Sequence, residues 1–169
     1  VQDPYTSYYD AKVVRDFVAL TQKLGFEPIL LPFKPNGKAM HIKGFLTRFS
    51  KTAKTQAEFL NRVAKLNVPL VGVDPAIVLS YRDEYKEALG DSRGDFHVLT
   101  AHEWLTNQLE SNALQSAVKN IAKSDHTFEW HLFPHCTEST FMPNSPKEWQ
   151  HIFAQFGQTL KVEKVGCCG

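Results

Sequence analysis

Apolar residues near the start of the chain recur first at the spacing of a helix and then as a short run. Residues 11–24 repeat apolar positions with helical periodicity, and Asp10 and Gly25 are suited to begin and end that helix. Residues 26–33 form an apolar run with two prolines, which predicts a short buried or edge strand. The polar loop 34–37 is expected to end this strand.

The following segments alternate between helical and strand patterns. Residues 38–49 are amphipathic but interrupted by Gly44, and Ser50 is a candidate cap for a longer helix that carries apolar positions as far as Leu66. Residues 68–73 form a compact apolar run, which predicts a strand.

Asp74 followed by Pro75 is a strong signal for the start of a helix. The aspartate can cap the helix, and proline is already restricted to the backbone angle of the first turn. This helix is predicted to run to Leu89 and to stop at Gly90. The order helix, strand, helices, strand, helix predicts an α/β fold with short parallel sheets flanked by helices.

The second half begins after a polar stretch with glycines, residues 91–95, which is the best candidate boundary between two lobes. Beyond it, the pattern predicts two helices, a strand, a helix stopped by Gly157 and a last strand, at residues 97–109, 111–123, 127–133, 145–156 and 159–165.

Composition and charge narrow the classes of protein to consider. Of the 169 residues, 43% are hydrophobic and 22% are charged, which is typical of a globular protein and excludes a disordered or fibrous one. The net charge of +1 argues against binding of nucleic acid, which usually needs a strong basic excess. No transmembrane segment or signal peptide is evident, so a cytoplasmic location is expected.

The ends of the chain and its cysteines are unusual. The first residue is valine and the last three are Cys167, Cys168 and Gly169, so we expect a stretch cut from a longer polypeptide. All three cysteines and four of the seven histidines lie in the last 44 residues.

A weak internal repeat relates the two halves. Thirty residues separate Cys136 from Cys167, and 32 separate Asp3 from Asn36. Both intervals contain a helix, a glycine stop and a predicted strand in the same order. We therefore expect two tandem repeats, residues 1–92 with the cysteines lost and residues 93–169 with the cysteines kept, although any two α/β units of similar length can align this way.

The three thiols follow predicted strands, so we expect them to converge at one edge of a parallel sheet. Thiolates gathered this way are typical ligands of iron-sulfur clusters or zinc, while the alternative is three unrelated buried cysteines. His131 and His135 add some support for zinc, but His135 could share a metal with Cys136 only from an irregular loop.

The motif formed by Cys136, thirty residues and Cys167-Cys168-Gly169 resembles the cysteine-rich CCG domain of heterodisulfide reductases and of the iron-sulfur subunits of glycolate and glycerol-3-phosphate oxidoreductases. Four other segments look more specifically like the C-terminal region of bacterial FAD and iron-sulfur dehydrogenases that act on D-2-hydroxy acids such as D-2-hydroxyglutarate or D-lactate: Leu31–Ala39, His41–Leu46, Leu70–Ala76 and Tyr81–Tyr85.

This resemblance implies that Cys136, Cys167 and Cys168 ligate a 4Fe-4S cluster that relays electrons from a flavin. It places the FAD outside this stretch, with FAD and ferredoxin-like domains of the same polypeptide as partners, and implies no catalytic residue here. The family's closing Cys-x-x-C pair is absent from these 169 residues, so the cluster site is expected to be incomplete.

The first repeat departs further from the family. It has Asp3, Asn36 and Gly37 at cysteine positions, and Asp74–Ile77 stands where its own cysteine pair would fall. No cluster is therefore expected in this repeat. The competing hypothesis for the whole chain is a structural or interaction module with at most a zinc site.

A basic stretch lies between Lys34 and Lys54, with five lysines, one arginine and no acidic residue. It is expected to be either a solvated helix face or a docking surface for an acidic partner. Within it, Asn36, Gly37 and Lys38 could hold an anion, although one lysine after one glycine is a weak signal.

Overall fold

The four strands of the structure, a computed structural model, pair in parallel. The structure describes residues 1–110, 114, 117–119, 128–164 and 166. In this part of the chain, β1 (Leu70–Gly72) pairs with β2 (Val98–Thr100), and β3 (Glu129–Leu132) pairs with β4 (Thr159–Val162). The predicted α/β class, with short parallel sheets flanked by helices, is confirmed.

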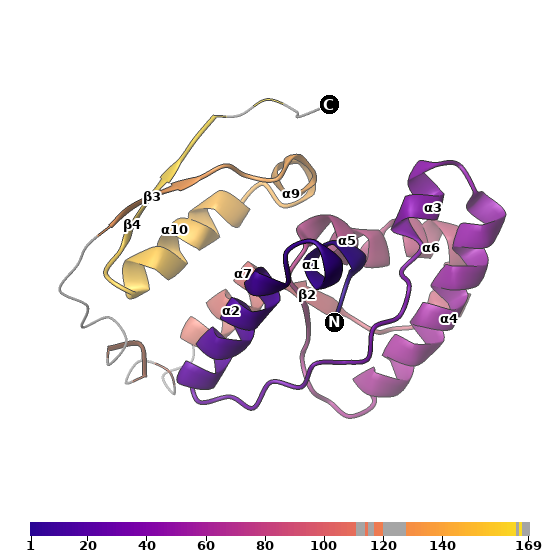
Figure 1. Cartoon of the computed structure of the whole chain (residues 1–169), viewed down its shortest axis with the longest axis horizontal. Helices are drawn as coiled ribbons and strands as arrows, with labels where there is room; N and C mark the ends of the chain where they lie inside the picture. The colour runs from indigo at the N-terminus through magenta and orange to yellow at the C-terminus, as the bar shows by residue number, and fades with distance from the viewer. Residues whose placement is uncertain (111–113, 115–116, 120–127, 165, 167–169) are drawn as a thin grey trace. The chain divides into compact units, whose positions relative to one another are not determined.

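Helices make up most of the rest of the described chain (Figure 1). They are α1 (Pro4–Tyr8), α2 (Ala11–Lys23), α3 (Lys38–Ile42), α4 (Leu46–Ala64), α5 (Pro75–Arg82), α6 (Glu84–Leu89), the 3₁₀ helix η1 (Gly90–Arg93), α7 (Ala101–Leu109), α9 (Cys136–Phe141) and α10 (Ser145–Gln155). None of the helices in the described ranges combines the length and apolarity that a bilayer span requires.

The chain divides into two compact units. The first contains Val1–Val14 and Leu30–Thr100, and the second contains Arg15–Ile29 and the described part of Ala101–Gly169. The two units group residues that lie close in space, whereas a repeat is a similarity between two segments. The division of the sequence into repeats at residue 92 therefore stays a prediction.

The core of the first unit forms around the apolar face of α4. This helix packs against α3 and α6, as Figure 1 shows. Its buried residues recur three or four positions apart, as a helix with one core-facing side requires. The core contains Phe49, Ala53, Ala57 and Leu60 from α4, Ile77, Val78 and Tyr81 from α5, Tyr85 from α6, Leu70 and Val98 from the strands, and Phe96.

The predicted helix start after β1 is confirmed. The Asp74 carboxylate accepts a hydrogen bond from the backbone N–H of Ile77 at 3.1 Å, and Pro75 is the first residue of α5. The helix that was predicted to be continuous is divided at Asp83 into α5 and α6, and α6 ends at Gly90, as predicted.

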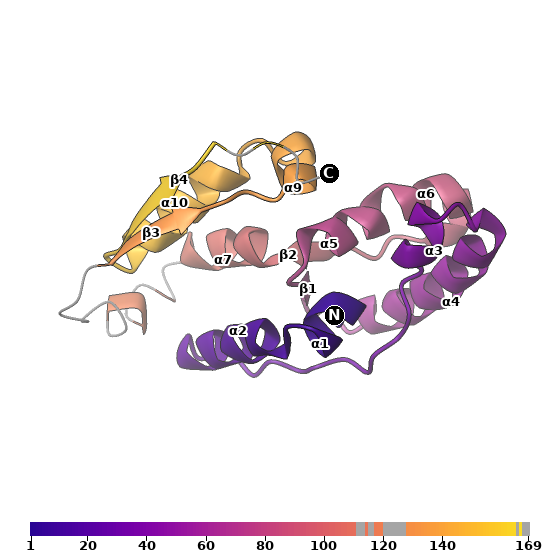
Figure 2. The same ribbon diagram turned by 45° about the horizontal axis from the view of Figure 1, so that its top comes forward.

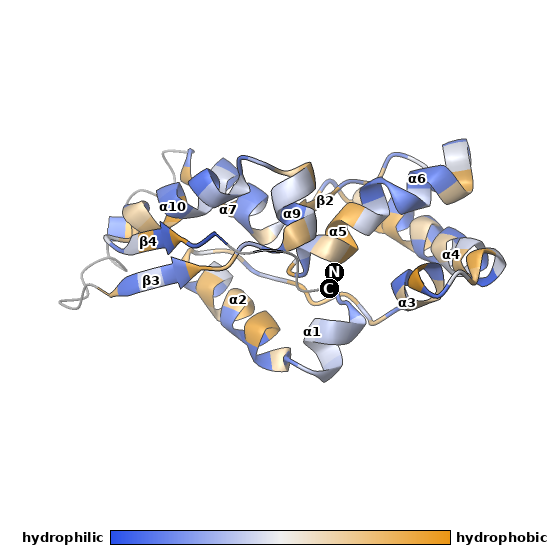
Figure 3. Cartoon of the chain, turned by 90° about the horizontal axis from the view of Figure 1, so that it is seen from above, coloured by the Kyte–Doolittle hydropathy of each residue, from blue (hydrophilic) through white to orange (hydrophobic). Residues whose placement is uncertain are grey.

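In the second unit, α10 packs against the β3–β4 sheet (Figure 2). Trp130 of β3 meets the ring of Phe153 with centroids 6.0 Å apart, and its register partner Leu160 is buried. Neighbouring residues of a strand point to opposite faces, so Glu129 and His131 share the other face. Both strands accordingly contain much blue in Figure 3, which marks hydrophilic residues.

Three sequence-based assignments were wrong. Residues 26–33 form no strand, because Pro28 and Pro32 lack the N–H donors of a ladder, and Ile29 is 81% exposed instead of buried. Residues 98–100 were assigned to a helix but form β2, which pairs with β1.

The third error concerns Ser50, which lies inside α4 instead of capping it. The chain turns at Gly44, whose φ is +74°, and the helix starts at Leu46. Most of the predicted helix at 111–123 lies outside the described residues.

Candidate metal centre

Cys136 is an exposed residue at the beginning of α9, and within the described chain it forms no disulfide. It follows the last residue of β3 by four positions, after the irregular segment 133–135. The backbone oxygen of Cys136 accepts a hydrogen bond from Thr140 Oγ1 at 2.9 Å. Strand β3 thus leads through a short irregular segment to Cys136, as predicted, although the thiol belongs to the first residue of α9 and not to a loop.

The pairing of β3 with β4 determines where the next cysteines leave the sheet. Leu132 pairs with Val162, and the N–H of Glu163 donates to the carbonyl of Leu132 at 2.9 Å. Since the strands are parallel, the segments that follow β3 and β4 leave the sheet at the same edge. Cys167 and Cys168 lie outside the described residues, so their approach to Cys136 stays a prediction.

The two histidines considered for zinc have different surroundings. His131 lies in β3, with Nδ1 2.5 Å from Glu163 Oε1 and Nε2 3.3 Å from Glu129 Oε1. His135 precedes α9 in the irregular segment, as sharing a metal with Cys136 would require. Within the described ranges, however, no three His, Cys, Asp or Glu side chains are arranged to hold a metal ion.

Charges around His131 compensate one another on the exposed sheet face. The ammonium of Lys161 lies 2.9 Å from Glu129 Oε2, and this contact holds the pKa of Glu129 below its usual value. The same contact raises the pKa of Lys161. His131 therefore belongs to a surface ion-pair network.

Asp3 and Asn36, which stand at cysteine positions of the predicted first repeat, organise the local backbone. Asp3 is 2% exposed, and its Oδ1 accepts from the N–H groups of Tyr5 and Thr6 at 2.8 and 2.9 Å, which caps α1. Asn36 Oδ1 accepts from the N–H of Lys38 at 2.9 Å, which forms a turn before α3.

Two buried tyrosines lie beside this turn and differ in their hydrogen bonding. Tyr85 Oη donates to the carbonyl of Asn36 at 2.6 Å. The centroid of the Tyr81 ring lies 5.1 Å from that of the Tyr85 ring, and the Tyr81 hydroxyl approaches the side chains of Gln56 and Asn36 without a hydrogen bond of normal geometry. Burial raises the pKa of Tyr81 to about 12, and it also raises the pKa of Tyr85.

Replacement by phenylalanine is expected to change the free energy of unfolding differently at the two tyrosines. Tyr85→Phe is expected to lower the free energy of unfolding at pH 7 by about 1–2 kcal/mol, because it removes a buried hydrogen bond and leaves a carbonyl unpaired. Tyr81→Phe is expected to change that free energy by less than Tyr85→Phe does, because the Tyr81 hydroxyl makes no hydrogen bond of normal geometry with Gln56 or Asn36. Urea unfolding followed by circular dichroism measures the free energy of both variants. Equal losses would contradict the difference in hydrogen bonding between the two tyrosines.

Tyr81 also predicts a dependence of stability on alkaline pH. The folded protein retains a phenolic proton that the unfolded chain releases near pH 10. The contribution of Tyr81 to the free energy of unfolding is therefore fully present below pH 10 and is lost as pH rises through about 12. Tyr81→Phe should therefore reduce the loss of stability between pH 10 and 12, by about 2–3 kcal/mol at most. Urea unfolding across this pH range is the measurement, and an unchanged pH profile would contradict it.

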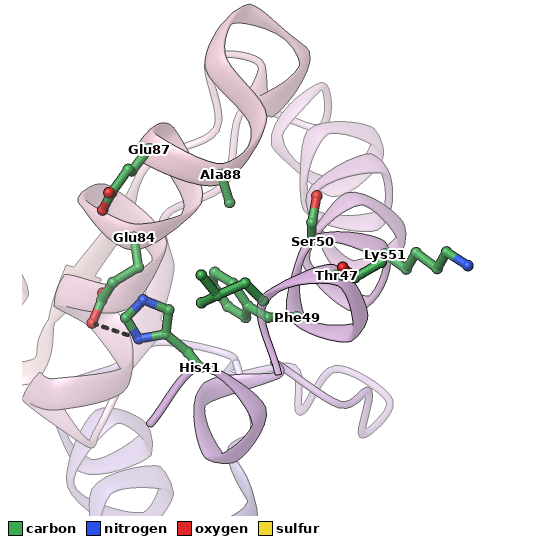
Figure 4. Close-up of a pocket in the computed structure, with 9 residues that line it drawn as sticks. His41, Thr47, Phe49, Ser50, Lys51, Glu84, Glu87 and Ala88 are labelled. Atoms are coloured by element: carbon green, nitrogen blue, oxygen red, sulfur yellow. Dashed lines mark ion pairs between the residues drawn. The ribbon is translucent and has the colours of Figure 1, made fainter. Parts of the chain in front are cut away.

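A surface pocket of about 610 Å³ lies beside the basic stretch, between α4 and α6 (Figure 4). His41 Nδ1 lies 4.0 Å from Glu84 Oε1, and the same carboxylate binds the ammonium of Lys38. Burial opposes ionisation of Glu84, but the hydrogen bond and charge of Lys38, together with hydrogen bonds from Ser80 and the backbone, lower the pKa of Glu84. The charge of Lys38 is thus compensated, which argues against the predicted anion site.

The basic stretch also exposes apolar side chains at the turn between α3 and α4. Ile42, Phe45 and Leu46 are each more than half exposed, and Arg48 lies over the ring of Phe45 at 5.7 Å. The suggestion that this stretch docks an acidic partner stays a prediction.

A group of polar side chains around the buried His102, in the second unit, was missed by sequence reasoning. His102 of α7 is 1% exposed and lies between Glu138 of α9, at 3.3 Å, and Glu148 of α10, at 3.2 Å. Trp149 Nε1 donates to Glu138 Oε1 at 3.2 Å. No local signal could have found this group, because its members are 36 or more positions from His102 and belong to three helices.

Comparison with known proteins gives a consistent set of relatives. Over all 169 residues, the chain is 81% identical to a protein of Haemophilus influenzae, 60% identical to one of Escherichia coli and 38% identical to one of Pseudomonas putida. All three are D-2-hydroxyglutarate dehydrogenases. The chain is similar along its whole length to part of these enzymes.

The match covers a small part of each dehydrogenase. The chain spans 16% of the length of these relatives, so further parts of the same polypeptide are expected as its neighbours. No family model and no solved structure matches the chain. The likeness to D-2-hydroxyglutarate dehydrogenases agrees with the predicted hydroxy-acid dehydrogenase, while nothing in it supports D-lactate as the substrate.

Proposed function

We propose that this chain is the C-terminal electron-transfer region of a D-2-hydroxyglutarate dehydrogenase, whose complete polypeptide oxidises D-2-hydroxyglutarate to the 2-oxo acid. Identity of 38–81% to such enzymes along all 169 residues supports the substrate. The parallel pairing of β3 with β4 is the observation that supports the local role, because it directs two cysteine-bearing segments to one sheet edge.

In this proposal, Cys136, Cys167 and Cys168 ligate a 4Fe-4S cluster. Cys136 fits such a ligand, because its thiol is exposed, is not in a disulfide with any described residue, and lies next to the sheet edge. Only three residues carry the chain from Lys164 to Cys167, a reach of at most about 11 Å. When bound, the cluster would supply one-electron transfer, and its fourth ligand would come from outside this stretch.

The chain's own contribution would be to hold these ligands and to present them to the rest of the enzyme. The β3–β4 ladder fixes the spacing of the two segments at their departure from the sheet, and α10 supports it from one face. We place the FAD and the ferredoxin-like domains elsewhere in the same polypeptide. The two-repeat organisation belongs to this proposal, supported by the shared order of a short helix, a longer helix and a positive-φ glycine in each half.

The second candidate is a structural module with a zinc site. The adjacency of His135 and Cys136 in and after an irregular segment favours it, since imidazole and thiolate are both zinc ligands. In that case the region would stabilise the enzyme without carrying electrons.

Metal analysis and anaerobic titration of the full-length enzyme separate these functions. We expect iron with acid-labile sulfide, and bleaching of the visible iron-sulfur absorption by D-2-hydroxyglutarate. L-2-hydroxyglutarate and D-lactate serve as controls that should bleach far more slowly. Stoichiometric zinc at the three cysteines would favour the structural module, and bleaching by D-lactate alone would contradict the proposed substrate.

A further inference from the structure

The buried group around His102 connects the helix that carries Cys136 to two other helices. Glu138 is the third residue of α9, two positions after Cys136, and is 6% exposed. It lies 3.3 Å from His102 Nδ1 and accepts a hydrogen bond from Trp149 at 3.2 Å. One carboxylate of α9 thus contacts both α7 and α10.

Helix α9 depends on such contacts for its position. It has only six residues, and no side chain caps its first turn. A helix this short is not stable by itself in water, because few hydrogen bonds compensate the entropy of its first turn. Its orientation, and with it the direction of the Cys136 side chain, must therefore be set by the residues that α9 buries.

Burial of both groups favours this contact. Both nitrogens of the His102 ring lie within 3.3 Å of a carboxylate oxygen. A ring that is 1% exposed requires polar partners for its nitrogens, and a carboxylate that is 6% exposed likewise requires donors. His102 and Glu138 are each therefore costly to leave without the other.

We infer that His102 and Glu138 are positioning residues for Cys136, holding α9 so that this thiol has a fixed place at the sheet edge. The consequence for a metal cluster rests on the function proposed above. The anchoring of α9 does not, and it can be measured without metal.

Two matched variants of the full-length enzyme test the inference. Glu138→Gln and Glu148→Gln make the same chemical change beside the same histidine, but only Glu138 belongs to α9. We expect Glu138→Gln to accelerate hydrogen exchange of the α9 amides about tenfold or more, because it replaces the buried carboxylate that contacts both His102 and Trp149 with a neutral amide. Glu148→Gln should change it less than twofold, since its carboxylate is 36% exposed and belongs to α10.

The metal-loaded enzyme allows a second measurement, on the cluster itself. Glu138→Gln should shift the reduction potential and the electron paramagnetic resonance spectrum of the cluster, and Glu148→Gln should leave both unchanged. His102→Gln provides a further variant in case Glu138→Gln does not fold, and should act in the same direction.

Equal effects of the two glutamate variants, or no effect of either, would overturn the positioning role. Wild-type enzyme without iron would instead overturn the proposed function, and the exchange measurement would still decide whether Glu138 anchors α9.

Discussion

Replacing Cys136 by serine is expected to remove one cluster, about four iron atoms per polypeptide, from the full-length enzyme. A serine hydroxyl is a much poorer ligand for iron than a thiolate, and three cysteines leave no spare thiol in this stretch to replace it. Iron and acid-labile sulfide analysis, together with the visible absorption of anaerobically purified enzyme, measures the loss. The double variant Cys167→Ser, Cys168→Ser should lose the same amount.

Thr140→Ala is the control for disturbance of α9. Thr140 bonds to the backbone oxygen of Cys136 from the same helix but offers no thiolate, so its variant should retain the full iron content. Unchanged iron in Cys136→Ser would remove this cysteine from the ligand set. An equal loss in Thr140→Ala would mean that helix stability, and not ligation, explains the result.

The elements that sequence reasoning predicted correctly are those whose signals are local. Asp74 and Pro75 mark the start of α5 because a cap and a proline act within one turn. Gly25 and Gly157 end helices because each adopts a positive φ, of +89° and +68°. Such choices depend on neighbours in the sequence, so they are readable before any fold is known.

The errors involve residues whose structure depends on distant partners. Val98–Thr100 is a strand because Leu70–Gly72 lies beside it, and nothing in the segment itself distinguishes it from the start of α7. The apolar run at 26–33 contains residues that remain exposed in this chain, so hydrophobicity alone misassigned it.

The residues of the candidate site differ in the same way. Cys136 was proposed from its residue type and spacing, and its role as a ligand stays a prediction. His102 and Glu138 could not, because α7, α9 and α10 bring them together only in the fold. Among the positions that the predicted repeat assigned to lost ligands, Asp3, Asn36 and Asp74 show the same limit, since they serve the local backbone as caps and a turn.

Gly94→Ala is expected to destabilise the first unit by about 3 kcal/mol or more. Gly94 has φ of +74° and ψ of −171°, a conformation that essentially only glycine adopts and that costs another residue about 1–3 kcal/mol. A Cβ atom there would lie 2.4 Å from Asn61 Nδ2. Asn61 bonds to the carbonyls of Ala57 and Arg93 at 2.8 and 2.7 Å and accepts from the N–H of Phe96 at 3.2 Å. The new methyl group would therefore break a junction between α4 and the segment leading into β2.

Gly44→Ala is the matched control, because Gly44 has the same φ of +74° but no atom within 4 Å of an added Cβ. It should cost only about 1–2 kcal/mol, the strain of a left-handed residue. Adding Asn61→Ala to Gly94→Ala should be less damaging than the sum of the two single changes, because the clash disappears with the amide. Urea unfolding followed by circular dichroism of the wild type and the four variants, including Asn61→Ala alone, measures these losses. Equal losses for Gly94→Ala and Gly44→Ala, or strict additivity with Asn61→Ala, would show that contact with Asn61 does not control this junction.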